Sequence, residues 1–226
     1  NAVVGWARLL RTGQLDSDGT NHALEVIERN AGVQKQIIED LLDVSRIITG
    51  KLLITSETVD LLLVIHAAID VIRPAAAAKE IRIRTHFDIP EILVLGDADR
   101  LQQVIWNLLA NAVKFTPQQG EIDIHVKQHS SQAEVRIEDS GPGIPVEFLP
   151  HVFERFSQAD GTSTRKYGGL GLGLAIVRHL VELHGGTVAA CNNESNGGAV
   201  LTVRLPAIEH QPTEFKPRQL PTVGAH

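Results

Sequence analysis

One long stretch of the sequence, from about residue 20 to residue 49, repeats apolar side chains at spacings of three, four or seven residues. That period is typical of an α-helix with a single apolar face, and Gly50 ends the pattern. A shorter apolar segment, residues 1–12, precedes it and is separated from it by Gly13 and a polar turn. Two antiparallel helices cannot bury faces this wide between themselves, so we expect residues 1–50 to pair with a second copy as a four-helix bundle. Packing of this hairpin on the rest of its own chain is the alternative. The apolar positions of the long stretch include Leu24, Ile27, Ala31, Ile38, Leu41 and Ile48.

Residues 51–206 predict a second domain, in which helices and strands are mixed. Short apolar runs predict strands and longer periodic segments predict helices, the first of them kinked or interrupted at Pro74. Strands and helices do not alternate regularly, which favours an α+β sandwich. Residues 207–226 contain prolines without an apolar period and predict a linker or disordered tail. The expected strands are residues 52–59, 81–87, 92–95, 121–128, 133–138, 187–190 and 199–205, and the expected helices are residues 61–79, 97–115 and 171–184.

The composition narrows the setting in which such a chain works. A formal net charge of −6 argues against a broad surface for nucleic acid. The single cysteine, Cys191, cannot form an internal disulfide, and we expect it to be a small buried residue of a strand. No apolar run approaches the roughly 20 residues of a membrane span, so we expect a cytoplasmic location and no membrane contact within these residues. The chain begins in what resembles mid-helix and without methionine, so we expect a fragment, whose parent could be membrane-anchored.

The helix expected over residues 97–115 carries two asparagines on one face. Asparagine is a mediocre helix former, yet Asn107 and Asn111 lie one turn apart, with Lys114 three residues further on. Neutral amide oxygens suit a hard cation such as Mg²⁺ that is shared with phosphates, and a lysine supplies a point charge for those phosphates. The alternative is that the two amides only cap neighbouring loops.

A second candidate is the segment Asp139-Ser-Gly141-Pro-Gly143, which directly follows an expected strand. A buried carboxylate can accept a hydrogen bond from the exocyclic amine of adenine, and glycines let the backbone approach a flat base closely. The same residue types are common in tight turns, which is the alternative interpretation.

A third candidate is the glycine-rich segment from Gly168 to Gly173, which leads into the last expected helix. Closely spaced glycines leave backbone N–H groups free to face an anion, and the N-terminus of the helix adds partial positive charge. The Gly-x-Gly-x-Gly spacing matches neither the dinucleotide fingerprint nor a Walker A loop, and the signatures of protein kinases are missing. A flexible loop without a ligand is the alternative.

Two phenylalanines, Phe153 and Phe156, stand between the second and third candidates and precede a polar run that contains Arg165 and Lys166. Two aromatic anchors and a mobile basic loop would make a lid over a polyphosphate. A solvated surface loop explains the same composition.

The order and spacing of these segments resemble a known family. An Asn-rich helix, Asp-x-Gly-x-Gly, Phe-x-x-Phe and Gly-x-Gly-x-Gly, in that order, look like the N, G1, F and G2 boxes of sensor histidine kinases of two-component systems, members of the Bergerat-fold ATP-binding superfamily. The resemblance covers residues 57–206, and residues 1–10 and 37–46 resemble the dimerisation and phosphotransfer hairpin of the same family. It implies an α/β-sandwich ATP-binding domain that follows a dimeric helical hairpin.

The resemblance also implies residue roles, with ATP and Mg²⁺ as the ligands. Asn111 would coordinate Mg²⁺, with Asn107 supporting it or the phosphates. Lys114 would contact phosphate, and Asp139 would bind the adenine amine. Gly141 and Gly143 would shape the base pocket. The hinge and the phosphate-binding turn of the lid would be formed by Gly169, Gly171 and Gly173. Arg165 and Lys166 would neutralise the outer phosphates.

The implied reaction is transfer of the γ-phosphoryl group of ATP to a histidine, followed by relay to an aspartate of a response-regulator receiver domain. The acceptor histidine would lie before Asn1, outside the chain. We do not expect His22 or His66 to replace it, because neither is followed by the family's acidic residue and proline, and we expect His184 to pack near a helix end.

The sequence leaves two other functions open. The first is a regulatory module of the same fold that senses ATP or ADP without transferring phosphate. The second is a gyrase- or MutL-like ATPase, but that branch is expected to carry a water-activating glutamate one turn before the metal-binding asparagine, where this chain has Asn107.

Overall fold

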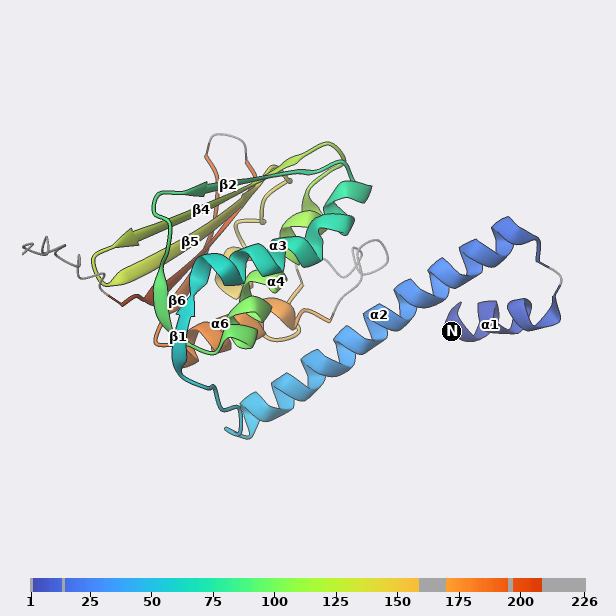
Figure 1. Ribbon diagram of the computed structural model, residues 1–226, viewed down its shortest axis with the longest axis horizontal. Coiled ribbons are helices and arrows are strands. Elements are labelled where there is room, and N and C mark those ends of the chain that lie inside the picture. Colours follow the sequence, from blue (N-terminus) through green and yellow to red (C-terminus); the bar gives the residue numbers. More distant parts are fainter. Residues whose placement is uncertain (1, 14, 159–169, 195–196, 209–226) are drawn as a thin grey trace, which may run out of the picture.

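The N-terminal part of the chain is a helical hairpin that projects from an α/β body (Figure 1). The computed structural model describes residues 2–13, 15–158, 170–194 and 197–208. Helix α1 (Ala2–Thr12) ends before Gly13, whose φ of +69° suits glycine. The 32-residue helix α2 (Ser17–Ile48) begins after Asp16, whose side chain accepts a hydrogen bond from the Gly19 N–H at 2.8 Å. The hairpin expected for residues 1–50 is therefore present.

The body is an α+β sandwich, as the sequence predicted. Its five-stranded sheet has the order β2-β4-β5-β7-β6, in which β2 and β4 are parallel and the other neighbours are antiparallel. A second sheet pairs β1 with β3. The elements of the body in chain order are β1 (Glu57–Asp60), α3 (Leu61–Ala78), β2 (Arg82–Phe87), β3 (Leu93–Gly96), α4 (Ala98–Phe115), β4 (Glu121–His129), β5 (Gln132–Asp139), the 3₁₀ turn η1 (Leu149–His151), α6 (Gly173–Leu183), β6 (Thr187–Asn192) and β7 (Ala199–Pro206).

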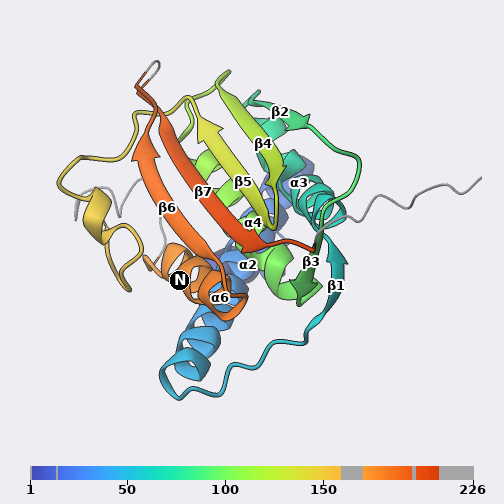
Figure 2. The ribbon, with the colours of Figure 1, turned by 90° about the vertical axis from the view of Figure 1, so that its left-hand side faces the viewer.

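The two faces of the large sheet have different environments. Helices α3, α4 and α6 lie behind the sheet in Figure 2, and no described helix covers the face turned to the viewer. Strand β4 shows the consequence, because Ile122, Ile124 and Val126 are fully buried while Asp123 and His125, which alternate with them, are only partly buried. One face therefore holds the hydrophobic core and the other is polar.

Helix α3 is long and apolar enough to span a membrane by length and composition, which the sequence analysis did not expect. It packs against α4, and Leu61, Ile65 and Ala68 are fully buried there. The sequence predicted a kink or an interruption near Pro74, and the interruption is wrong, because one helix runs through this residue.

Three further details differ from the sequence predictions. No strand forms over residues 52–56, and the expected first strand is confined to β1, although the Leu52 side chain is buried. Cys191 is exposed, not buried, because β6 is an edge strand and this residue lies on the outward side of its alternating pattern. Ala207 and Ile208 of the predicted tail pair with β3, while residues 209–226 lie outside the described part of the chain.

A buried polar contact joins the hairpin to the body. Asp43 of α2 is only 5% exposed, and its carboxylate accepts hydrogen bonds from Arg100 Nη1 at 3.1 and 3.2 Å and from Gln103 Nε2 at 2.7 Å. The neighbouring Val44 and Ile47 belong to the hydrophobic core of the body. The C-terminal part of α2 is thus held to the body by polar contacts with α4 and by apolar contacts with the core.

The change Asp43→Ala should loosen this junction. It removes the carboxylate from Arg100, whose side chain is 23% exposed, and loss of a charged hydrogen bond costs about 1–3 kcal/mol when the remaining charge can still reach water. We expect faster amide hydrogen exchange over residues 40–48 and unchanged protection in the large sheet. The control is Glu39→Ala, which removes only the exposed 3.8 Å pair with Lys35. Unchanged exchange over residues 40–48 in Asp43→Ala would contradict the assignment.

Candidate nucleotide-binding site

A cavity of about 370 Å³ opens between α4, the loop after β5 and the start of α6. Its volume lies in the range of small-molecule binding sites. Of the candidates from the sequence, Asn107, Asn111, Lys114, Asp139, Gly143, Gly171 and Gly173 line it. Segments far apart in the sequence therefore converge on one site.

Helix α4 contributes the polar face that its spacing predicted. Its opposite side is buried in the core, which leaves Asn107, Asn111 and Lys114 at the cavity. Asn107 is only 6% exposed, and its Nδ2 has no hydrogen-bond acceptor among the described residues. A buried amide without an acceptor is costly. A ligand oxygen in the cavity would remove that cost.

Lys79 holds the C-terminal end of α4 in place, a role that the sequence did not reveal. Its Nζ donates hydrogen bonds to three carbonyl oxygens, those of Val113 (2.7 Å), Lys114 (2.9 Å) and Thr116 (3.1 Å). These carbonyls lie at the helix end, where intrahelical donors are missing. Lys79 is also the C-terminal cap of α3. It therefore joins the end of α3 to the end of α4, beside the backbone of Lys114.

Burial lowers the pKa of Lys114 below its ordinary value. A partly desolvated ammonium group attracts an anion more strongly than a fully hydrated one does. This position therefore favours an anionic ligand.

Asp139 lies at the end of β5 and is 7% exposed. Its Oδ1 accepts hydrogen bonds from the N–H groups of Gly141 at 2.8 Å and Ala199 at 3.2 Å. Burial raises the pKa of this carboxyl, although both hydrogen bonds favour the charged form. Both bonds fall on Oδ1, and Oδ2 has no donor among the described residues, so it can accept one from a ligand.

The two glycines of the Asp139 segment have different positions. Gly141 does not line the cavity but supports Asp139, and a Cβ on it would lie 3.0 Å from the Phe115 carbonyl oxygen. Gly143 lines the cavity with a φ of +75°, and a Cβ there would meet the Gly197 carbonyl oxygen at 2.2 Å. Glycine is therefore required at both positions.

Asn192 fixes the loop that contains Gly143. Its Oδ1 accepts a hydrogen bond from the Ile144 N–H at 2.7 Å, and its Nδ2 donates one to the Ile144 carbonyl at 2.7 Å. The sequence did not indicate this residue, because Asn192 lies almost fifty positions from the loop along the chain. The reciprocal pair ties the cavity wall to β6.

The glycine-rich segment brings the start of α6 to the cavity. Leu172 precedes the helix and its side chain cannot cap it, so the first N–H groups of α6 have no side-chain cap within the described residues. A Cβ on Gly173 would lie 2.9 Å from Asn107 Oδ1, so only glycine allows this close approach of α6 to α4. Gly171 has a φ of +68°, and its carbonyl accepts a hydrogen bond from the Phe156 N–H at 3.0 Å.

The two predicted aromatic anchors are not equivalent. Phe153 packs against the hydrophobic core, whereas the Phe156 side chain is 60% exposed and contacts the glycine segment through its backbone. The prediction of two aromatic anchors therefore fits Phe153 but not Phe156, whose backbone has a φ of +60°. The predicted Arg165, Lys166 and Gly169 lie outside the described residues.

The hairpin also reaches the cavity, which the sequence did not indicate. Gln36 and Asp40 of α2 are among its lining residues, and Gln36 Nε2 donates a hydrogen bond to Asp40 Oδ1 at 2.8 Å. Burial raises the pKa of Asp40, with further contributions from the nearby Asp43 and Glu39 carboxylates. One acidic side chain from the hairpin thus stands beside a site that favours anions.

One wall of the cavity carries a carboxylate, and another carries amides, a lysine and a helix N-terminus. This arrangement suits a ligand with a polar base and a phosphate chain. These features define a nucleotide-binding domain. Residues 96–209 match the family model of histidine kinase-, DNA gyrase B- and HSP90-like ATPases, and the chain belongs to this family.

Individual relatives refine this assignment. The chain is 38% identical to hybrid signal transduction histidine kinase D of Dictyostelium discoideum, over 92% of this chain but only 16% of that protein. The structure of the mycobacterial sensor histidine kinase MprB superposes with a TM-score of 0.60 at 31% identity, covering 69% of this chain and 99% of that one. Full-length ShkA in complex with AMPPNP gives a TM-score of 0.72 at 27% identity, covering 92% of this chain and 43% of that one.

Nucleotide affinity should fall on acidification, because an ionised Asp139 carboxylate accepts a hydrogen bond more strongly than the protonated carboxyl group does. Burial raises its pKa, so ionisation is lost at a higher pH than for an ordinary aspartate. We expect Asp139→Asn to weaken ADP binding by about 10- to 100-fold at neutral pH and to remove the Asp139 part of the acid limb. ADP titrations by calorimetry across pH would measure both effects.

The matched control is Asp70→Asn, an equal charge change at an exposed position of α3. ADP has its own phosphate titration, so the difference between the two variants isolates Asp139. Identical pH profiles in Asp139→Asn and Asp70→Asn would contradict a role for this carboxylate in binding.

Proposed function

We propose that this chain is the ATP-binding catalytic region of a sensor histidine kinase, which transfers the γ-phosphoryl group of ATP to a histidine outside these residues. A receiver-domain aspartate of a response regulator would then take the phosphoryl group. The observation that carries the proposal is the convergence of Asp139, Asn107 and the uncapped start of α6 on one cavity. The chain spans 16% of the length of the hybrid kinase that it matches, so the activity of the whole protein is part of the proposal.

Asp139 would select the base. The Gly141 and Ala199 N–H groups hold Oδ1, and Oδ2 would accept the exocyclic amine of adenine. Gly143 would let the backbone lie close to the flat ring, because no side chain intervenes. A base with a carbonyl at that position would place two acceptors face to face, so adenine is favoured over guanine.

Asn107, Lys114 and the first turn of α6 would hold the phosphate chain. The Asn107 amide lacks an acceptor among the described residues, and the partly desolvated Lys114 supplies positive charge. Asn111 would bind Mg²⁺, which suits the neutral oxygen donors present here and would neutralise phosphate charge. Gly171 and Gly173 would position the N–H groups of the turn. The predicted lid residues Arg165, Lys166 and Gly169 would complete the site.

The geometry supports transfer to an external nucleophile over hydrolysis. Phosphoryl transfer depends chiefly on positioning and charge stabilisation. Asn107 stands where the related ATPases are expected to carry a general base, and an amide cannot take a proton from water. A neutral imidazole needs no such activation, so a histidine brought to the cavity mouth would suffice.

The hairpin would present that histidine within a dimer. Its apolar positions are exposed in the single chain, with Leu24 at 52%, Ile38 at 58% and Ile48 at 64%. Pairing with a second hairpin would bury this stripe in a four-helix bundle. The proposal places residues 1–226 in the cytoplasm, since the donor site requires ATP.

The test of transfer mixes this chain with Mg-ATP and a separate hairpin that carries the family's histidine box. We expect acid-labile, alkali-stable phosphate on the hairpin histidine. Asn111→Asp should reduce its rate at least about 100-fold, because a carboxylate changes the charge at the proposed metal position. Asn21→Asp, the same change at an exposed position of α2, should leave the rate unchanged.

Two outcomes would redirect the proposal. ATP binding without phosphohistidine would favour the nucleotide-sensing module. Release of inorganic phosphate without an acceptor hairpin would favour an ATPase.

The dimer has its own test, light scattering coupled to gel filtration. Ile38→Glu places a charge in the exposed stripe and should convert the dimer to a monomer, because burial of an unpaired carboxylate is unfavourable. Leu63→Glu changes a 67% exposed leucine of α3 in the same way and should leave the mass unchanged. A monomeric wild-type chain at micromolar concentration, or a dimer that persists in Ile38→Glu, would contradict the bundle.

A further inference from the structure

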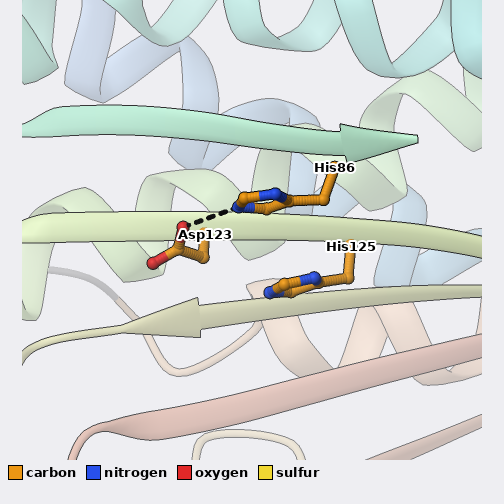
Figure 3. Close-up of side chains that lie close together, drawn as sticks. All are labelled: His86, Asp123 and His125. Atoms are coloured by element: carbon orange, nitrogen blue, oxygen red, sulfur yellow. Dashed lines mark hydrogen bonds and ion pairs between the residues drawn. The ribbon is translucent and has the colours of Figure 1, made fainter. Parts of the chain in front are cut away.

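The uncovered face of the large sheet carries a group of metal-ligating side chains unrelated to the nucleotide cavity. His86 of β2 and His125 of β4 are partners in the parallel register of these strands, and Asp123 lies two residues before His125 on the same side. Figure 3 shows the three side chains together on this face. Their potential ligand atoms all lie within 4.8 Å of one another.

The two imidazoles lie against each other. The ring centroids of His86 and His125 are 4.5 Å apart with an interplanar angle of 11°, and His86 Nε2 is 3.0 Å from Asp123 Oδ1. Stacked rings would repel each other if both were protonated. A shared cation would bind the two rings in their neutral form, in which this repulsion is absent.

We propose that His86, Asp123 and His125 bind a divalent transition-metal ion of the Zn²⁺ class. Two imidazole nitrogens and one carboxylate oxygen form a donor set that suits Zn²⁺ and its first-row neighbours and not Mg²⁺, which prefers oxygen ligands. Bonds of about 2 Å to one ion require the two rings to turn out of their stacked arrangement, because the in-plane lone pairs of stacked imidazoles run parallel and do not meet at one point. The three side chains are partly exposed and have room to turn.

Glu138 extends the group to a third strand. It is the register partner of Asp123 on β5, and its Oε1 lies 3.5 Å from His125 Nε2. Its Oε2 accepts a hydrogen bond from Asn193 Nδ2 at 2.8 Å, which holds the carboxylate in place. Arg136 Nε lies 3.0 Å from the same Oε1, so Glu138 would become a fourth ligand only on releasing Arg136 and would otherwise stabilise the ion electrostatically.

Arg84 is the competitor of the ion. It forms a bidentate pair with Asp123, with Nε 2.9 Å from Oδ1 and Nη2 3.0 Å from Oδ2. The Arg84 side chain is 51% exposed and also contacts Glu121, so it has an alternative partner when it releases Asp123. Metal binding would exchange one cation for another at the same carboxylate.

The bound ion would cross-link the edge of the sheet. Strand β2 is one of the two edge strands of the described sheet, in which it pairs with β4 alone. Ligands on both strands would resist separation of this pair, and an ion that binds the folded state alone would raise the melting temperature. Glu138 directly precedes Asp139, so the metal group and the nucleotide cavity lie on opposite faces of β5.

The test is Zn²⁺ binding to the untagged, nucleotide-free chain in competition with a chromophoric chelator. Nucleotide is left out because its phosphates bind Zn²⁺ themselves. We expect one site, weakened at least about 10- to 100-fold in His86→Ala and in His125→Ala, since even loss of a supporting group costs that much. His129→Ala, at an exposed position at the end of the same strand, should bind as the wild type does.

Arg84→Gln supplies a test of opposite sign. It removes the competing guanidinium group from Asp123 and should tighten Zn²⁺ binding. In a separate measurement, Co²⁺ absorption bands should appear in the wild type and disappear in His86→Ala. Circular dichroism would check that each variant is folded. Zn²⁺ affinity unchanged in both His86→Ala and His125→Ala, or wild-type binding only at millimolar Zn²⁺, would overturn the proposal.

Discussion

The packing of α4 is the constraint on which the rest of the structure depends. One side of this helix fills the core between α3, α6 and the large sheet, with Leu108 and Leu109 fully buried. The helix cannot rotate without exposing that side, so the direction of Asn107, Asn111 and Lys114 is fixed by hydrophobic burial. The core thus positions the polar groups of the cavity, and rotation of α4 by a fraction of a turn would cost several buried side chains at about 1.5–3 kcal/mol each.

Close packing of backbone segments at two glycines brings the other parts of the cavity up to α4. Gly173 lets α6 come within contact of Asn107, and Gly141 lets the chain turn back so that its N–H reaches Asp139. At both positions a single methyl group would collide with an atom that belongs to the site. The two glycines therefore determine the geometry of the cavity. They allow α6, the end of β5 and the loop after it to come close to one another.

The α+β class and most elements were predictable from the sequence because hydrophobic period and alternation are local signals. Asn107, Asn111 and Asp139 were predictable as site residues because polar side chains stand out within such patterns. Lys79 was not predictable, since its acceptors are backbone carbonyls more than thirty residues away, and such acceptors leave no mark on the sequence. The role of Asn192 was not predictable for the same reason. The exposure of Cys191 depended on the strand order, which periodicity along one strand does not determine.

The position of α2 links the hairpin to the cavity energetically. The helix is anchored by the buried Asp43 and places Asp40 in the wall of a cavity that attracts anions. An ionised carboxylate at Asp40 would repel a phosphate chain at short range, and the raised pKa of Asp40 reduces that repulsion by favouring the neutral form. A bound nucleotide would therefore disfavour the arrangement in which Asp40 lines the cavity. By linkage, any force that holds α2 in this arrangement disfavours the nucleotide by the same free energy. The contact of Asp43 with Arg100, which holds α2 in place, would therefore lower the affinity of the cavity for a nucleotide.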